Sequence, residues 1–462
     1  MMRLPHRGKP RGQDTLCHFR FLRQNPFGTL GGEQKMRRIV LAVALSAFGI
    51  MIAPAIAASP PSPQTIYSVP SVAEMEKLGE EYPSLRMVGY RAGSNQGGGY
   101  FSWNASSKAP ADNCTVFPGR NSTGRWVREL PNSQLDVTMC GARWDGKTDD
   151  ALAISAAFTA ASRLGLSVTC PGGAGRIART VAPGSFVGVV LRCQGMAASS
   201  IVCAVQNGPC FLFQNPNGSS EIQAPQFYDL SIAAGPAPAH PTVMIQYNRM
   251  EGGFADSAAT QSYMMRPLVQ RVRLEGGEIG VQCSKCFDGD MSLNLLTGQS
   301  RHGFDLEGSD WMSIGAAGTN RIVSTGDYPI KLASHGTFGN GNLVTHNDIL
   351  SPKPGTGAYI YTSARTAYIE KNFLEGQTRG ACEIKVDNGA LHATVRDNHV
   401  TDPSVKNWLC VVPRLAQAEF TGNQTTSNGQ GPAHFDDGKS SYNSVMPQTI
   451  VHFGNWSESG FP

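Results

Sequence analysis

The sequence predicts an all-β protein built as a parallel β-helix, a solenoid of stacked strand–turn–strand rungs. The main observation is a repeat beyond Gln223, in which asparagine recurs at intervals of 26, 27, 25, 26 and 25 residues: Asn294, Asn320, Asn347, Asn372, Asn398 and Asn423. Between these asparagines lie short strands with alternating apolar residues, such as GFDLEG and PIKLAS. Units of this length bury their apolar face only by stacking on neighbours. The composition agrees, because 52 glycines and only 16% charged residues favour a turn-rich β architecture over a helical bundle.

The repeated asparagines are assigned to structure rather than to chemistry. In register, each side chain would hydrogen-bond its equivalent on the next rung, about 4.8 Å away along the axis. A propeller or a leucine-rich horseshoe fits less well, because the blade length of the first and the leucine pattern of the second are missing.

The first 57 residues are expected to lie outside the folded protein. Residues 36–57 are typical of a bacterial secretory signal peptide, with basic residues at 35–38, an apolar stretch from Ile39 and small residues at the cleavage position, 55–57. An uncleaved membrane anchor is the alternative, but Pro54 and the small residues after it shorten the apolar run. Residues 1–35 would be a misassigned start or a disordered extension. We therefore expect a secreted or periplasmic protein without stable membrane insertion.

Three further segments follow the signal peptide. Residues 58–135 are expected to form a small α+β N-terminal cap module, residues 136–430 the β-helix, and residues 431–462 a C-terminal cap or tail. Residues 1–57 hold nine Lys/Arg and two Asp/Glu, which leaves 30 Lys/Arg against 33 Asp/Glu in the rest. This balance gives no argument for a nucleic-acid partner. The oligomeric state stays open.

Cysteine usage fits an oxidising compartment. Cys17 lies upstream of the signal peptide, and the remaining ten cysteines form an even number. Cys283-x-x-Cys286 alone could suggest redox or zinc chemistry, but the sequence contains no second CxxC, so a local disulfide is the better interpretation. The overall connectivity stays open, although two further pairs lie close in the repeat: Cys203 with Cys210, and Cys382 with Cys410.

The stretch KTDDALAISAAFTAASRLG, residues 147–165, predicts a helix that covers the open first rung. Thr148 or Asp149 can cap its start, and Gly165 can end it. Asp145-Gly146 is a turn signal, so the three aspartates at 145, 149 and 150 are assigned to structure rather than catalysis. The apolar surface of this helix would be formed by Leu152, Ala156, Phe158 and Leu164.

The segment VTMCGARWDGKTDDALAISAAFTAASRLGLSVTCPGG, residues 137–173, resembles the opening motif of the pectate-lyase-like, or pectin-lyase-fold, superfamily. The preceding MVGYRAGSNQGGGYFSW and GRWVREL are similar to the module before that motif in tailspike-like polysaccharide depolymerases. The resemblance implies a right-handed parallel β-helix that acts on an acidic or complex polysaccharide, by hydrolysis or by β-elimination. Cys140 stands where the family has an aromatic residue, which suggests a disulfide there.

The catalytic blocks of polygalacturonase-like members are not reproduced. Only SHG at 334–336 and EIK at 383–385 come near them, and the calcium ligands of pectate lyases are not evident. We therefore predict no metal and no cofactor, with calcium as an open alternative, and the sequence leaves the mechanism open.

The period of two along the strands predicts a column of outward side chains on successive rungs. The inward positions are Val281, Phe304, Leu306, Ile330, Leu332, Ile360, Cys382, Ile384, Leu409 and Val411. The outward column then contains Gln282, Asp305, Glu307, Lys331, Tyr359, Tyr361, Glu383, Lys385 and Cys410. Such a stripe could bind a glycan, although charged outward residues of a β-helix are commonly just its solvated face.

Within this column we expect Asp305, Glu307 and Lys331 to be catalytic. Asp305 and Glu307 are two residues apart, about 6.6 Å between Cα atoms, which fits the carboxylate pair of a glycosidase. An eliminating enzyme would instead use Lys331 or a tyrosine as the base. The expected substrate-binding residues are Tyr359, Tyr361, Glu383, Lys385 and His335.

His302 and Trp311 are candidates of lower rank. The expected function is therefore an exported polysaccharide-degrading enzyme, a lyase or a glycoside hydrolase, with a polysaccharide as its partner. The alternative is a non-catalytic exported glycan-binding or adhesive β-helix protein.

Overall fold

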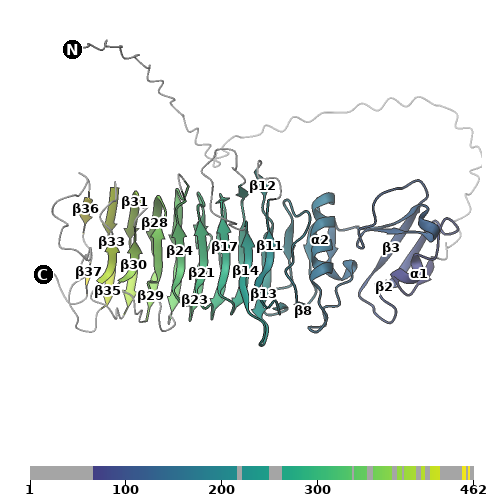
Figure 1. Ribbon diagram of the computed structural model, residues 1–462, viewed down its shortest axis with the longest axis horizontal. Coiled ribbons are helices and arrows are strands. Elements are labelled where there is room, and N and C mark those ends of the chain that lie inside the picture. The colour runs from purple at the N-terminus through teal and green to yellow at the C-terminus, as the bar shows by residue number, and fades with distance from the viewer. Residues whose placement is uncertain are drawn as a thin grey trace, which may run out of the picture. The chain divides into compact units, whose positions relative to one another are not determined.

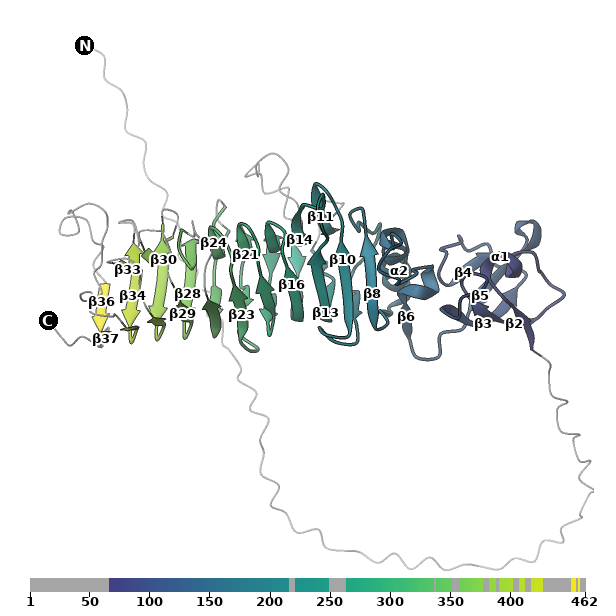
Figure 2. The same ribbon diagram turned by 90° about the horizontal axis from the view of Figure 1, so that it is seen from below.

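The computed structural model describes residues 66–457 with ten gaps: 216–220, 249–262, 336–337, 351–356, 377–381, 388–389, 402–406, 412–416, 427–449 and 454–455. Within the described residues, parallel strands stack rung upon rung, as Figures 1 and 2 show. The predicted parallel β-helix is therefore confirmed. The expected signal peptide and the extension before it lie outside the described residues.

The N-terminal module contains one mixed sheet in the order β1-β2-β3-β5-β4. Its elements are β1 (Tyr67–Val69), α1 (Val72–Met75), β2 (Ser84–Gly89), β3 (Gly97–Asn104), β4 (Val116–Pro118), the 3-10 turn η1 (Arg120–Ser122) and β5 (Arg125–Arg128). Strand β2 alternates buried and exposed residues, and its Leu85 and Met87 pack with Phe101, Phe117 and Trp126 into a separate small core. The module therefore has the α+β composition that the sequence predicts.

Three strands make up a typical rung of the β-helix. One column of paired parallel strands contains β11 (Gly208–Phe213), β14 (Pro241–Tyr247), β17 (Ile279–Ser284), β21 (His302–Glu307), β24 (Tyr328–Ala333), β27 (Ile360–Ser363), β30 (Cys382–Val386) and β33 (Asn407–Val411). We call it the first sheet. A short sheet beside it contains β12 (Ile222–Gln223), β15 (Met264–Met265) and β18 (Cys286–Phe287).

The other strands form one long sheet, called the second sheet below. It begins with β6 (Gln134–Asp136), β7 (Ser167–Thr169), β8 (Gly173–Ile177), β9 (Val190–Arg192), β10 (Ser199–Cys203), β13 (Gln226–Ala234) and β16 (Leu268–Glu275). It then divides into two columns. One is β19 (Asp290–Ser292), β22 (Ser313–Ile314), β25 (Asn342–Thr345), β28 (Thr366–Glu370), β31 (His392–Arg396), β34 (Gln417–Thr421) and β36 (Ile450–Phe453). The other is β20 (Leu295–Thr297), β23 (Asn320–Val323), β26 (Asn347–Leu350), β29 (Phe373–Glu375), β32 (His399–Thr401), β35 (Gln424–Thr426) and β37 (Trp456–Ser457).

The last two strands fall in the segment expected to be a C-terminal cap or tail. Strand β36 pairs in parallel with β34, and β37 pairs in parallel with β35. The rung architecture therefore continues beyond residue 430, where the asparagine pattern ends.

The asparagine ladder forms as predicted at the turn between the two columns of the second sheet. From Asn320 to Asn423, each side-chain Nδ2 donates to the Oδ1 of the next asparagine at 2.9 Å. All six predicted asparagines are buried. Because each amide also bonds backbone groups of adjacent rungs, the ladder satisfies the polar atoms of a turn that is shut off from water.

Helix α2 (Ala151–Leu164) covers the first rungs, and Gly165 ends it with a φ of 65°. Asp149 Oδ1 accepts from the Ala151 amide at 3.2 Å. Phe158 packs against Phe213, with ring centroids 5.4 Å apart. The assignment of Leu152 and Leu164 to the buried face is wrong, because the stripe facing the core is Ala151, Ile154, Ala157, Phe158, Ala160 and Ala161, and both leucines lie outside it, exposed.

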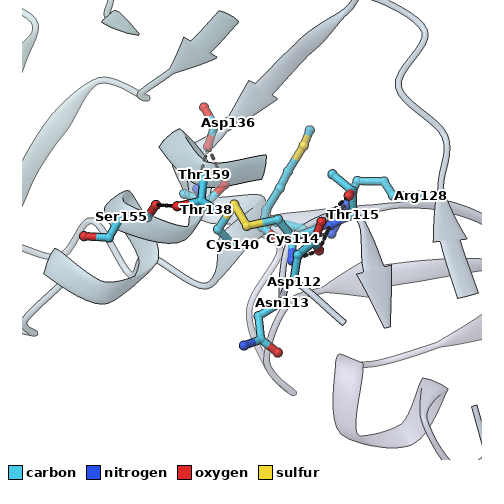
Figure 3. Close-up of a disulfide and its surroundings, with 12 residues drawn as sticks. Asp112, Asn113, Cys114, Thr115, Arg128, Asp136, Thr138, Cys140, Ser155 and Thr159 are labelled. Carbon is cyan, nitrogen blue, oxygen red and sulfur yellow. Dashed lines mark hydrogen bonds between the residues drawn. A yellow bond between two sulfur atoms is a disulfide. The ribbon is translucent and has the colours of Figure 1, made fainter. Parts of the chain in front are cut away.

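A disulfide between Cys114 and Cys140 joins the module to the β-helix, as Figure 3 shows. The 3-10 turn η2 (Val137–Cys140) carries the second cysteine. Beside the disulfide, the buried Arg128 guanidinium donates to the Cys114, Gly97, Gly98 and Met139 carbonyl oxygens. The disulfide suggested at Cys140 is thus present.

Three other disulfides lie in the described β-helix: Cys170–Cys193, Cys203–Cys210 and Cys283–Cys286. The last two agree with the sequence analysis. Cys382 is also disulfide-bonded, and the side chain of Cys410, the residue on the adjacent rung, lies outside the description. No helix among the described residues is long and apolar enough to span a bilayer.

Candidate functional site

The register of the first sheet aligns most of the predicted outward column. Gln282 pairs with Asp305, Asp305 with Lys331, Lys331 with Tyr361, and Tyr361 with Lys385. Strands β17, β21, β24, β27 and β30 each supply one member. Because the strands are parallel and in register, these five residues form one row on the outer face, which we call the polar column.

A chain of side-chain contacts runs through the first half of the polar column. Gln246 Nε2 donates to Gln282 Oε1 at 2.6 Å, and Gln282 Nε2 donates to Asp305 Oδ2 at 3.2 Å. Lys331 Nζ lies 3.1 Å from Asp305 Oδ1. The Asp305 side chain is only 3% exposed and that of Lys331 23% exposed. Asp305 is thus held in an ion pair, whereas Lys331 remains reachable from solvent.

Aromatic rings border the other half of the polar column. The Tyr328 and Tyr361 ring centroids are 4.8 Å apart, and His302 stacks on Tyr328 at 5.9 Å. His302 Nδ1 donates to the Tyr328 carbonyl oxygen at 3.0 Å. Burial lowers the pKa of His302. Lys385 Nζ lies 5.6 Å from the centre of the Tyr361 ring and 2.8 Å from Asp387 Oδ2.

Glu307 follows Asp305 by two residues on β21 and is half-buried. Burial raises the pKa of its carboxyl group, and the negative charge of Asp305 adds to this, while Lys331 and His335 oppose it. His335, also half-buried, is therefore close enough to Glu307 to act on it electrostatically. Desolvation of a carboxyl group favours its protonated form, which can donate a proton.

The structure contradicts the sequence prediction at Tyr359 and Glu383. Both residues are fully buried, so neither side chain is open to an incoming substrate. The Tyr359 amide donates to the Glu383 carbonyl oxygen at 2.8 Å, so the two residues occupy neighbouring positions on adjacent rungs. Burial does not alternate at the start of β30, where Cys382, Glu383 and Ile384 are all buried.

The site also contains a residue that the sequence analysis did not select. Tyr328 begins β24, three residues before Lys331, where a strict period of two assigns it to the inner face. Its stacking on His302 and Tyr361 places it with the outer cluster. Among the described residues, no group of three or more His, Cys, Asp or Glu side chains is arranged to hold a metal ion.

A family model matches the module, and solved structures match most of the chain. Residues 68–131 match the sequence model of the family described as the phage tail protein small four-stranded β-sheet domain. A search of the curated proteins gave no significant match. Solved structures match over most of the chain at low sequence identity.

Three tailspike structures illustrate the match at TM-scores above 0.5. The full-length tailspike protein 2 from Escherichia coli O157:H7 bacteriophage CAB120 has a TM-score of 0.55 at 12% identity, with 79% of this chain and 47% of that chain covered. The enzymatically active domain of bacteriophage CBA120 tailspike protein 2 has a TM-score of 0.55 at 13% identity, with 78% and 53% covered. The tailspike protein of Acinetobacter phage vB_ApiP_P1 has a TM-score of 0.52 at 15% identity, with 85% and 70% covered.

The match covers 47% and 53% of the length of the first two tailspike chains, and at this identity the likeness concerns the fold. The resemblance to the pectate-lyase-like group with a tailspike-like N-terminal module is confirmed at that level. The chain therefore has the tailspike-type parallel β-helix fold, and a β domain that matches the phage tail family precedes it.

Proposed function

We propose that the protein is an exported polysaccharide-degrading enzyme that cleaves glycosidic bonds on the outer face of the first sheet. The observation that carries this proposal is the half-buried Glu307 with its raised pKa, beside the ion pair of Asp305 and Lys331. The tailspike-type fold supports it, since one matched structure is described as an enzymatically active domain.

Glu307 is the proposed general acid. Its raised pKa keeps the carboxyl group protonated to higher pH than an ordinary glutamate, so it can protonate the leaving glycosidic oxygen. Asp305 would be the second carboxylate, either accepting a proton from the attacking water or attacking the anomeric carbon itself. Because Lys331 covers Asp305, substrate binding must first turn the ammonium group away, toward a hydroxyl or carboxylate of the glycan.

Hydrolysis is favoured over β-elimination by the state of Lys331. The Nζ atom of Lys331 lies 3.1 Å from Asp305 Oδ1 and is engaged in this ion pair, so it is not free to take the proton that elimination removes. Tyr328 and Tyr361 would offer apolar ring faces to the sugars, and Lys385 would pair with acidic substituents. The four disulfides with both partners described support a secreted or periplasmic location.

The test is incubation of the chain from Ala58 with acidic and neutral bacterial and plant polysaccharides, following reducing ends and the ultraviolet absorbance of unsaturated uronate in parallel. We expect reducing ends without new absorbance, and loss of this activity in Glu307→Gln. The matched control is Glu375→Gln, which changes an exposed carboxylate on β29. New absorbance would contradict hydrolysis, and an unimpaired Glu307→Gln variant would contradict the role of Glu307.

A non-catalytic glycan-binding role is the second candidate. The observation favouring it is the near-complete burial of Asp305 in an ion pair, which keeps its carboxylate from an incoming sugar. Binding to one polymer without any release of reducing ends across the panel would select this alternative.

A further inference from the structure

A second candidate site lies on a different sheet from the polar column. A groove of about 440 Å³ runs over β28, β31 and β34 of the second sheet and is bordered by the turns at residues 311 and 340–341. Its volume lies in the range of small-ligand sites. Its lining includes Trp311, Asn340, Tyr368, His392, Thr394 and Glu419.

Trp311 is placed in this groove at an energetic disadvantage. It has a φ of 55°, a left-handed backbone conformation that bulky residues rarely adopt. Its large apolar side chain is also exposed, since 59% of the residue's surface is accessible to solvent. The turn itself recurs, since Arg266 and Asp288 have the same backbone conformation on the preceding rungs. Those two side chains are polar and form an ion pair at 2.9 Å. Trp311 thus places a large exposed ring where the two preceding rungs carry polar side chains.

The Trp311 ring is nevertheless held in place. A Cβ atom on Gly341 would lie 2.6 Å from the indole, so the ring packs directly on the backbone of the next rung. Asp310, which is almost buried, accepts from the Gly339 and Asn340 amides at 2.7 and 2.6 Å and fixes this turn. The Trp311 amide donates to the Asn340 carbonyl oxygen at 2.8 Å. One face of the ring is therefore supported by the protein while much of the side chain stays open to solvent.

The floor of the groove continues this surface over successive rungs. Tyr368 pairs with Thr394, and Thr394 pairs with Glu419, so the three side chains form a row along the axis. Tyr368 is 40% exposed, and Glu419 is also exposed. Because rungs are about 4.8 Å apart, an elongated ligand along the row would meet an aromatic ring, a hydroxyl and a carboxylate in turn.

The charge of the lining restricts the ligand. Its described lining residues include the carboxylate of Glu419 and no lysine or arginine. A stretch of uronates would meet a like charge without a compensating cation, whereas sugar hydroxyls can donate to Glu419 and Asn340. We propose that this groove is a second glycan-binding site, separate from the polar column, that holds an uncharged stretch of polysaccharide with its apolar sugar faces on Trp311 and Tyr368. The proposal rests on the proposed function for the class of ligand but not for catalysis.

The test measures binding by calorimetry in the Glu307→Gln background, so that no probe is consumed. The probes are the hexamers of cellulose, chitin and mannan, with hexagalacturonate as the charged counterpart. We expect at least one neutral hexamer to bind, Trp311→Ala to weaken it at least tenfold, and Tyr368→Ala to weaken it several-fold. Phe373→Ala is the matched control, because this exposed aromatic stacks on His399 at 5.3 Å and does not line the groove.

Unchanged affinity in both groove variants, an equal loss in Phe373→Ala, or no binding of any neutral hexamer would overturn the proposal. Hexagalacturonate binding that depends on Trp311 would overturn the choice of an uncharged ligand. Circular dichroism checks that each variant is folded. If the groove variants lose binding of the hexamers while the unmutated chain cleaves no polysaccharide, the proposed catalytic function is wrong and the groove remains a glycan-binding site. If the unmutated chain cleaves a polysaccharide but Trp311→Ala does not change the affinity for the hexamers, the proposed function stands and the groove is not a glycan-binding site.

Discussion

Replacement of Lys331 by methionine tests whether the centre of the polar column is a coupled ion pair. The change leaves the 3% exposed Asp305 side chain with the Gln282 amide, at 3.2 Å, as its remaining described side-chain contact. Removing one partner of a buried pair costs about 3–5 kcal/mol. Because Lys331 is 23% exposed, water can reach part of the vacated space, so we expect a loss at the lower end, about 3 kcal/mol in the free energy of unfolding.

The second half of this prediction is a double-mutant cycle. Asp305→Asn removes the charge but keeps a polar side chain beside Gln282, and we expect it to cost about 1 kcal/mol. The double variant should then be no less stable than Lys331→Met alone, because with asparagine at position 305 no unpaired carboxylate remains beside the methionine. The assay is urea unfolding followed by circular dichroism, with Lys385→Met as control, since its more exposed pair with Asp387 should contribute about 1 kcal/mol or less. A loss below about 0.5 kcal/mol in Lys331→Met, or strict additivity in the cycle, would refute the coupling.

Three more predictions concern the ladder, the proposed acid and the disulfide. Asn372→Ala removes four hydrogen bonds, two donated by its Nδ2 and two accepted by its Oδ1. At about 1 kcal/mol each, urea unfolding should show that the free energy of unfolding falls by about 4 kcal/mol. A fall of less than about 1 kcal/mol would argue against a stabilising ladder. Because the pKa of Glu307 is raised and its protonated form is the active one, the rate of hydrolysis should fall as pH rises through that pKa; a rate that increases over this range would contradict the acid role. Replacing Cys114 and Cys140 by serine opens a link between residues 26 apart and should cost about 3 kcal/mol; tryptophan fluorescence during urea unfolding would reveal an unchanged module if the link is unimportant.

The predictable part of the fold depends on side chains that repeat. Asn320 and Asn347 are 27 residues apart in sequence, yet their amides meet at 2.9 Å, because the rung length brings equivalent positions into register. The same register brings Asp305 beside Lys331. Any feature that recurs once per rung can therefore be located from the sequence.

The errors occur where the chain leaves the regular strand. Tyr359 lies just before β27 and Glu383 is the second residue of β30, and both are fully buried, which a period of two cannot show. Trp311 is only a candidate of lower rank from the sequence, because its groove is assembled from turns and strands of several rungs. Sequence spacing alone does not show that Gly341 lies beneath the indole ring.

The two candidate sites differ in how they depend on the scaffold. The groove residues Trp311 and Tyr368 lie on the surface of the second sheet, so substitutions there should change binding with little effect on stability. Asp305 is instead almost fully buried and paired with Lys331, so removal of one partner affects both stability and the charge beside Glu307. If the polar column is catalytic, Lys331→Met should thus alter the pH dependence of cleavage as well as the free energy of unfolding, because its positive charge opposes the rise in the pKa of Glu307. The expected direction is a further increase in that pKa, which moves the fall in rate to higher pH.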